Sequence, residues 1–403
     1  MRTVADVTIT QALIDTQSDA NKIPYIHIYI DDTDYSSRLL YLEHHEEPYR
    51  ERAVIGLSNR DGALDDLDLT GCEFEIGYGY DSTSHGGSAN DYVLTATLWV
   101  KSIQKTSKGG ERIYQIYAEG MWSRLRMEKT LPGVVSWKAT IPAVEGQYIT
   151  PSEPNGHYYE CTVAGVTGET EPSEWPLSGT VDDGTVTWSE AGSSAPYSNL
   201  FNATHTIEEI MQLTVESLGW TWTPVSDSDG LIDVFHPVFA IGQGGYEAGA
   251  SVLYRLVWMT KSYLRCRPST VMQPVYRTED DVADIVYYSD QDPYFDEFDS
   301  QIGQLEPNSI LILCNQDPSG EWNTPEYKII PGTAVDQDEI DKYFEVIEVF
   351  TDGNIRTPED ADARADAILT RIKAESSGGR VLLPFHDCQI ELYDKVGITD
   401  NRI

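Results

Sequence analysis

Polar and apolar residues alternate through the first third of the chain. The clearest alternating runs are Tyr25–Ile30, Ala53–Leu57, Cys72–Tyr80, Tyr92–Val100 and Arg112–Gly120. Successive side chains of a strand point to opposite faces of its sheet, so this alternation predicts strands with one buried and one solvated face. Polar turn sequences such as Asn59-Arg60-Asp61-Gly62 separate the runs. This part of the chain is therefore predicted to form a β-barrel or sandwich that closes on itself.

The pattern changes between residues 131 and 195. Tryptophan, proline and glycine interrupt short polar runs throughout 137–190, as in Tyr158-Tyr159-Glu160-Cys161, Glu171-Pro172, Trp175-Pro176 and Asp183-Gly184. Proline and glycine at this density exclude a helix, because both have very low helix propensity. This stretch is predicted to be a small β module.

Helical spacing begins after residue 200. Thr206-Ile207-Glu208-Glu209 has the form of a capping box, and apolar residues follow on one face up to Leu218. Ser251–Leu264 is predicted to form a second helix, and the acid-rich Asp290–Asp299 a loop or irregular edge. Residues 196–305 are therefore predicted to be an α+β region.

Strand and helix signals are both present in the final quarter. Ile310–Leu313 is a short apolar run typical of a buried strand. Thr357 is predicted to cap a helix over residues 357–375, with Pro358 at its first position and Asp360 completing the capping box. Gly378-Gly379 is predicted to end this helix, and Val381–Phe385 to open the closing strands. The fold class predicted for the whole chain is α+β, mostly β.

Charge is the strongest departure from average composition. The 403 residues include 28 basic and 66 acidic side chains, for a formal net charge of −38. A binder of nucleic acid or of an anionic membrane needs an electropositive surface, so both classes are disfavoured. A solvated acidic surface is the favoured interpretation. Two alternatives stay open: divalent cations bound between subunits, or an acidic wall beside a channel that lets DNA pass without adhering.

The five cysteines are odd in number, widely spaced and free of CxxC pairs. They are predicted to be reduced thiols, buried in a protein made in a cytoplasm. The N-terminal residues alternate in polarity and have no apolar h-region, so no signal peptide is expected. No apolar run approaches the roughly 18 residues that a membrane-spanning helix needs.

Candidate catalytic and metal-binding patterns were each weighed against a structural role. No Gly-x-Ser-x-Gly motif accompanies the histidines, and a pair of acids is uninformative among 66. In His44-His45-Glu46-Glu47, adjacent side chains point in different directions, and zinc ligands are usually spaced further apart. Asp31-Asp32-Thr33-Asp34 and the 290–299 cluster lack the spacing of an EF-hand. We therefore predict no catalytic, cofactor-binding or metal-binding residues, no cofactor, and no enzymatic activity.

Aromatic residues of the 137–190 module are candidates for sugar contacts. Tyr159, Trp175 and Trp188 could stack on the rings of a host-surface glycan. A small module also needs large side chains to fill its core, and the core role is favoured for these residues.

Several of these motifs resemble the hub proteins of phage tails and baseplates. In the last quarter they are the strand Ile310–Asn315, the helical Ala361-Asp362-Ala363-Arg364-Ala365 and the turn Glu391-Leu392-Tyr393-Asp394-Lys395-Val396. Ala53–Asn59 and Leu67–Gly71 match the family in the first part of the chain. The 137–190 module is similar to a repeated phage module, described as carbohydrate-binding-like, with the pattern Tyr-x-Cys, Ala-Gly-x-x-Gly, Glu-Pro-x-x-Trp-Pro and Asp-Gly-x-Val-x-Trp.

The resemblance implies a domain order and a role. It implies a tube-protein-like β-barrel in residues 1–130, the inserted module in 131–195, an α+β hub region in 196–305 and a second barrel-like domain in 306–403. Three copies would form a ring at the distal end of the tail tube, linking the tube to the tip and gating DNA ejection. The chain ends soon after the Asp394 turn, so peptidoglycan-cleaving or fibre domains are expected in other subunits.

The resemblance also implies the surroundings of the chain. Its expected place is the tail tip or baseplate of the virion, and its expected partners are its own copies, the tail tube, distal tail proteins and tail-tip or fibre proteins. DNA is expected only as passing cargo. Two alternatives remain: a distal tail protein, which forms a hexameric ring, and a peripheral receptor-binding adaptor whose module binds host-surface glycans.

Overall fold

The structure is a computed structural model of the whole chain. It describes residues 9–19, 21–108, 110–128, 135–143, 145, 147–193, 200–203, 205–241, 247–278, 280–301, 305–315, 329–353, 355, 357–376 and 378–402. The chain divides into two compact units, each built from separated segments. Unit 1 comprises residues 1–124, 264–303 and 377–403, and unit 2 comprises residues 125–263 and 304–376. The four predicted domain ranges stay a prediction.

Unit 1 begins with one eight-stranded sheet. Its elements are α1 (Gln11–Gln17), β1 (Pro24–Ile30), β2 (Thr33–Asp34), β3 (Leu39–Glu47), β4 (Arg50–Ser58), β5 (Glu73–Tyr80), β6 (Asp91–Leu94), β7 (Leu98–Lys108) and β8 (Glu111–Gly120), with short 3-10 turns at Ser36–Arg38 and Thr83–His85. The strand order is β2-β1-β5-β7-β8-β4-β3, and β6 also pairs with β5. Alternate residues of these strands, among them Ile28, Ile55, Phe74, Leu98 and Ile116, meet in a single buried cluster. One face of the sheet therefore curls around its own core, as the alternation predicts.

Two later segments of the chain complete unit 1. They contribute β20 (Val271–Val275), β21 (Ile285–Tyr288), β22 (Glu297–Gln301), β26 (Gly378–Leu382), β27 (Val396–Thr399) and most of β19 (Tyr263–Arg267). β21 pairs with β27 in parallel, and β22 pairs with β26 antiparallel. Each of these two sheets joins strands that lie about a hundred residues apart in sequence, so these two sheets form only when the last segment returns to unit 1.

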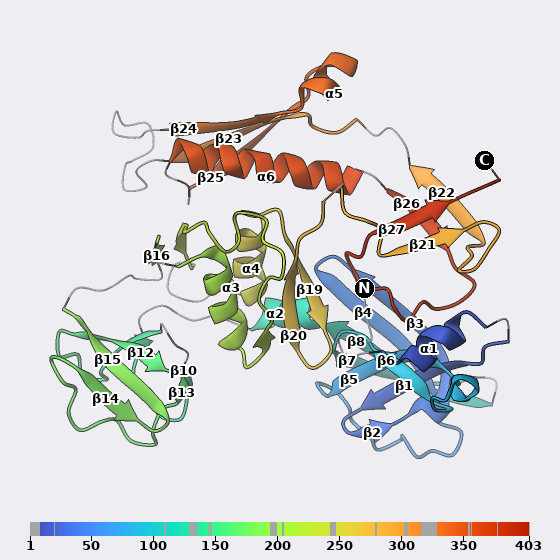
Figure 1. The fold of residues 1–403 in the computed structure, drawn as a ribbon. Helices are drawn as coiled ribbons and strands as arrows, with labels where there is room; N and C mark the ends of the chain where they lie inside the picture. Colours follow the sequence, from blue (N-terminus) through green and yellow to red (C-terminus); the bar gives the residue numbers. More distant parts are fainter. Residues whose placement is uncertain are drawn as a thin grey trace. The chain divides into compact units, whose positions relative to one another are not determined.

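Unit 2 contains the small β module. Its strands are β9 (Val135–Ser136), β10 (Pro142–Ala143), β11 (Tyr148–Thr150), β12 (Tyr158–Val163), β13 (Gly165–Val166), β14 (Thr180–Asp183) and β15 (Val186–Gly192). Five of them form a sheet in the order β14-β15-β12-β11-β9, and β10 pairs with β13 (Figure 1, green). The module has a buried cluster of its own that includes Ile149, Tyr159, Cys161 and Trp188.

The rest of unit 2 holds the helices α2 (Met121–Met127, which begins in unit 1), α3 (Ile207–Glu216), α4 (Gly249–Val257), α5 (Gln337–Lys342) and α6 (Pro358–Ser376). Its remaining strands are β16 (Leu200–Asn202), β17 (Thr221–Trp222), β18 (Val238–Ala240), β23 (Ser309–Asn315), β24 (Ile329–Val335) and β25 (Ile347–Asp352). The predicted capping box at the start of α3 is confirmed, since Thr206 and Glu209 each bond the other's backbone amide.

The sheet β24-β23-β25 packs one of its faces against α6 (Figure 1). The predicted cap of this helix is confirmed, because the Thr357 hydroxyl accepts a hydrogen bond from the Asp360 amide. Gly332 on β24 is required at the contact. A Cβ at that position would lie 2.2 Å from the backbone of Ala361 on α6.

Two predicted boundaries are wrong. The run Tyr92–Val100 is two strands, β6 and β7, which pair with different parts of β5. The helix predicted to reach Leu264 ends at Val257, because Asp229 accepts hydrogen bonds from the amide of Lys261 and the hydroxyl of Ser262 and holds the turn into β19. The stretch 290–299, predicted to be a loop or irregular edge, contains the start of β22, which belongs to a two-stranded sheet. Helix α1, with its Thr10 cap, was not predicted.

Candidate functional site

A buried ion network in unit 1 centres on Arg265 of β19. The guanidinium places Nη1 3.1 Å from Glu391 Oε2 and Nη2 2.7 Å from Asp394 Oδ1. Its Nε donates to the carbonyl oxygen of Leu392 at 2.7 Å. The side chain of Arg265 is buried, as are both carboxylates. One arginine therefore binds the whole turn that precedes β27.

Two further arginines complete the network. Arg267 Nη2 lies 2.8 Å from Glu391 Oε2, and Arg277 Nη2 lies 3.0 Å from Asp284 and 3.4 Å from Asp394. Burying ions is costly, and removing one member of such a network leaves an uncompensated charge inside the protein. The network is therefore suited to fixing one arrangement of the returning segments.

A second buried connection joins α1 to the returning segment. Asp387 accepts hydrogen bonds from Gln17 Nε2 at 2.9 Å and from the Tyr287 hydroxyl at 2.7 Å. The Cys388 amide donates to Gln17 Oε1 at 2.8 Å. Burial, with the nearby Asp387 carboxylate, raises the pKa of Tyr287, so its phenol remains a donor. The Tyr80 hydroxyl donates to a backbone carbonyl of the same segment.

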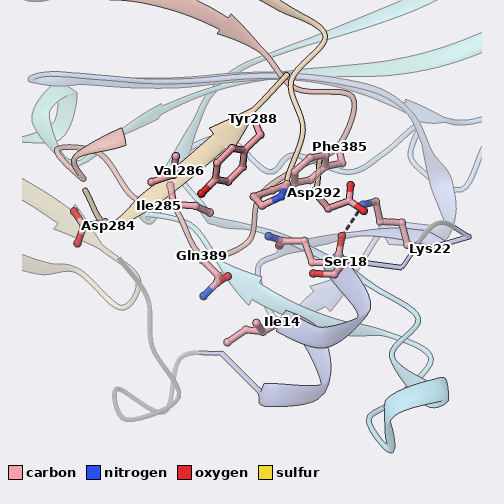
Figure 2. Close-up of a pocket in the computed structure, with 12 residues that line it drawn as sticks. Ile14, Ser18, Lys22, Asp284, Ile285, Val286, Tyr288, Asp292, Phe385 and Gln389 are labelled. Atoms are coloured by element: carbon pink, nitrogen blue, oxygen red, sulfur yellow. Dashed lines mark hydrogen bonds between the residues drawn. The ribbon is translucent and has the colours of Figure 1, made fainter. Parts of the chain in front are cut away.

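A cavity of about 400 Å³ lies beside these contacts (Figure 2). Lys22 crosses its rim, where Nζ donates to the carbonyl oxygen of Gln17 at 2.6 Å and lies 4.3 Å from the centre of the Phe385 ring. Asp284 and Asp292 add carboxylates, and Tyr288 adds a phenol. The volume would suit a small ligand. No histidine or cysteine is among the described residues that line the cavity.

Buried Glu51 and half-buried Cys266 form a pair of acidic groups near the network. Burial raises the pKa of Glu51 to about 7, and one of its carboxylate oxygens, Oε2, has no hydrogen-bond partner. Burial, reinforced by Glu51, also raises the pKa of the Cys266 thiol. A thiol must ionise to act as a nucleophile. The raised pKa therefore favours the protonated thiol form of Cys266. All five cysteines are free, and Cys161, Cys314 and Cys388 are buried.

The motifs that resemble the hub family hold elements together in this structure. Ala361 and Ala365 are buried between α6 and its sheet, and Asp362 accepts a hydrogen bond of 2.9 Å from the Thr333 amide on β24. Arg364 is buried 3.6 Å from Asp352 on β25, and burial lowers its pKa to about 10. These residues pack α6 and its sheet together and form no reactive site.

The predicted glycan-contact residues lie within or against the core of the module. Tyr159 and Trp188 are fully buried, and Trp175 is partly buried with its ring 4.6 Å from that of Tyr159. Asp183 accepts hydrogen bonds from the indole nitrogens of Trp137 and Trp188 at 2.7 and 3.0 Å. Of the three predicted residues only Trp175 keeps exposed ring surface. Sugar contact by these residues stays a prediction.

The candidate metal motifs are separated by the strand geometry. His44 is buried with Nδ1 3.0 Å from the Tyr78 hydroxyl, whereas His45 lies 2.8 Å from Glu43 on the solvated face of β3. Within the described ranges, no three histidine, cysteine or acidic side chains gather closely enough to hold a metal ion.

No helix among the described residues is long and apolar enough to span a membrane.

The Arg265 network and the separate contacts of Asp387 were not predicted from the sequence. The available signal was the charged pair in Tyr263-Leu264-Arg265-Cys266-Arg267, where arginine interrupts an apolar strand. The partners of Arg265 lie 126 to 129 residues further along the chain, so no local pattern could identify them.

Comparison with solved structures identifies the fold. The chain is similar to a tail protein from Neisseria meningitidis MC58, with a TM-score of 0.54 and 7% identity, over 94% of this chain and 87% of the other. It is also similar to the 43 kDa tail protein of prophage MuSo2 from Shewanella oneidensis, with a TM-score of 0.51 and 11% identity, over 94% and 89% of the two chains. No protein-family model matches the sequence, and no curated protein matches it. The α+β, mostly β fold class is confirmed.

Proposed function

We propose that this protein is a structural component of a phage tail. The observation that carries the proposal is the likeness of fold to a tail protein over 94% of this chain and 87% of the other. A likeness that extends over nearly the whole of both chains includes residues of both units. The hub-like motifs support the same role, because their residues have structural contacts. Arg364 of α6 pairs with Asp352 of β25, and Asp394 in the turn before β27 pairs with Arg265.

Within the tail, we place the chain at the hub. Three copies would form a ring at the distal end of the tail tube, join the tube to tail-tip or fibre proteins and gate the exit of DNA. The first β domain, curled around a single core, supports this place because such a domain can form a wall of a ring. The acidic excess of the chain also suits a channel wall, since DNA would pass it without binding. The role is structural, and the protein is not proposed to be an enzyme.

The copy number in purified particles tests the hub assignment. Quantitative mass spectrometry against a tail-tube protein of known stoichiometry should give three copies per particle. Six copies would favour a distal tail protein, and a larger number a peripheral receptor-binding adaptor. Absence from purified particles would reject a tail role.

Sugar binding by the small β module is a separate proposal, supported by the exposed part of Trp175. Its indole nitrogen donates to Glu171 at 3.0 Å, which fixes the ring at the module surface. A glycan array with the intact protein and with Trp175→Ala tests it. Binding that is lost in the variant would support a host-surface glycan as partner, and no binding by the intact protein would reject it.

A further inference from the structure

One face of the sheet β24-β23-β25 is left uncovered within the described residues. Ile310, Ile312 and Cys314 of the central strand β23 are buried in the cluster that includes α6. The residues between them, Leu311 and Leu313, point to the opposite face because side chains alternate along a strand. Both leucines are partly exposed.

The strand register places further apolar side chains on that face. Val335, Ser309 and Ile347 form one row across the three strands. Thr333, Leu311 and Val349 form the next row, and Pro331, Leu313 and Thr351 the third. These nine positions carry no charge. Val335 is 51% exposed, and Ile347 and Val349 are each 54% exposed.

A fixed aromatic turn borders the same face. Tyr343 and Phe344 precede β25 and are both exposed, with Phe344 at 60%. Asn308 is buried, and its side chain bonds the Phe344 carbonyl at 2.9 Å and the Val346 amide at 2.8 Å. Asn308 therefore fixes the backbone that carries the exposed Phe344 ring. Exposed apolar side chains that extend an apolar surface are typical of a site that binds a partner.

Acidic residues lie at one end of this face, in the segment that connects β24 to β25, and their charge indicates which kind of partner would bind. Helix α5 and the turn after it carry Asp338, Glu339, Asp341 and Glu345, against a single Lys342. Lys342 lies 3.8 Å from Glu339 and is already paired. A second copy docked by the same face would bring two acidic rims together, within a pair of chains that each carry −38. Like charges at an interface are unfavourable, whereas a basic rim would be attracted.

We propose that this uncovered face, with the Tyr343-Phe344 turn, binds a different protein whose contact surface has an apolar centre and a rim of lysine and arginine. The face supplies an uncharged apolar centre, and α5 supplies the acidic rim. The proposal rests on the proposed function in one respect: the partner is taken to be another protein of the phage tail. It does not depend on the number of copies in the ring.

Photo-crosslinking in assembled tails tests the proposal. p-Benzoylphenylalanine is placed at Val349 of the full chain, with Val234 as the control because that side chain is also exposed in unit 2. The Val349 variant should crosslink to a different protein, at a segment with apolar residues flanked by lysine or arginine, and the Val234 variant should not. Crosslinks to a second copy, crosslinks to an acidic segment, or an incorporated chain without crosslinks would each overturn the proposal.

Charge reversal provides an independent test. Asp338→Lys with Glu345→Lys should reduce incorporation into tails by about tenfold or more, because the rim would then repel a basic partner. Glu169→Lys with Glu174→Lys makes the same change at exposed positions of the small β module and should leave incorporation unchanged. Equal incorporation of both double variants would overturn the proposal. If the unaltered chain is itself absent from tails, the proposed function fails instead, so the two failures are distinguishable.

Discussion

The buried side-chain amide of Asn308 donates a hydrogen bond of 2.9 Å to the carbonyl oxygen of Phe344, whose own ring is largely exposed. The other end of the same amide accepts from the Val346 amide at 2.8 Å. One buried residue thus fixes the backbone on both sides of Glu345. This contact orders the aromatic turn beside the uncovered sheet face, so the turn is formed before any partner arrives.

Replacing Asn308 with alanine should loosen this turn. The variant loses the hydrogen bonds to the Phe344 carbonyl and the Val346 amide, which together contribute about 1–3 kcal/mol to the unfolding free energy. Hydrogen exchange should accelerate at the Val346 amide. Gln337→Ala serves as the control, because its hydrogen bond to Asp341 is exposed. Unchanged exchange at Val346 would mean that Asn308 does not hold the turn.

Replacing Arg265 with methionine should destabilise unit 1. The variant leaves Glu391 and Asp394 buried without their central cation, a change that costs about 3–5 kcal/mol in comparable buried pairs. Urea unfolding of the full chain, followed by hydrogen exchange of β27, measures the loss. Arg60→Met is matched to it, since the Arg60–Glu111 pair is exposed and is expected to contribute at most about 1 kcal/mol. Equal losses from the two variants would contradict the assigned role of the network.

Ionisation of the buried Glu51 carboxyl should lower the free energy of unfolding as pH rises. Burial raises the folded-state pKa from 4.5 to about 7, so between these values the folded chain holds a proton that the unfolded chain has released. The stability contributed by this proton is present below about pH 4.5 and is lost as pH rises through about 7. Glu51→Gln cannot ionise and should be more stable than the parent at pH 8, by about 3 kcal/mol relative to their difference at pH 4.

Urea unfolding at both pH values measures this difference. Glu43→Gln, at an exposed position on β3, is the control and should follow the parent at both pH values. Parallel pH profiles for the parent and Glu51→Gln would contradict a protonated Glu51 in the folded chain.

Asp183 should be required for the small β module. Its carboxylate accepts from Trp137, Trp188 and the Gly168 amide, so Asp183→Ala leaves three donors without their partner. The expected loss is on the order of 3 kcal/mol, visible as an earlier fluorescence transition of the module tryptophans. Asp182→Ala, one residue earlier and exposed, should change the transition little. If both variants unfold alike, the tryptophans are not held as described.

Sequence patterns predicted correctly those helices and strands that are determined by residues close together in the chain. The helix caps at Thr206 and Thr357 were identified from sequence, because each hydroxyl accepts from the amide three positions further on. The long alternating strands were identified in the same way. The early end of α4 at Val257 was missed, since it depends on Asp229, about thirty residues before the turn it holds. Local periodicity alone extended that helix to Leu264.

Long-range relationships were beyond the reach of sequence patterns. Nothing near Arg265 indicates Asp394, and nothing near Gln17 indicates Asp387, although both pairs are buried contacts of unit 1. The division of the last hundred residues between two units has the same cause. The segment after Ser376 forms β26 and β27, which pair with β22 and β21 about a hundred residues earlier in the chain. Pairing over that distance depends on the tertiary structure and leaves no local sequence pattern.

The position and symmetry of the chain in an assembled tail test the central claim most directly. Cryo-electron microscopy of intact tails, averaged around the tail axis with and without imposed symmetry, would locate both units in density. The account predicts three copies in a ring on the axis, at the distal end of the tail tube. Six copies in a ring, a peripheral position away from the axis, or no density for this fold would contradict it.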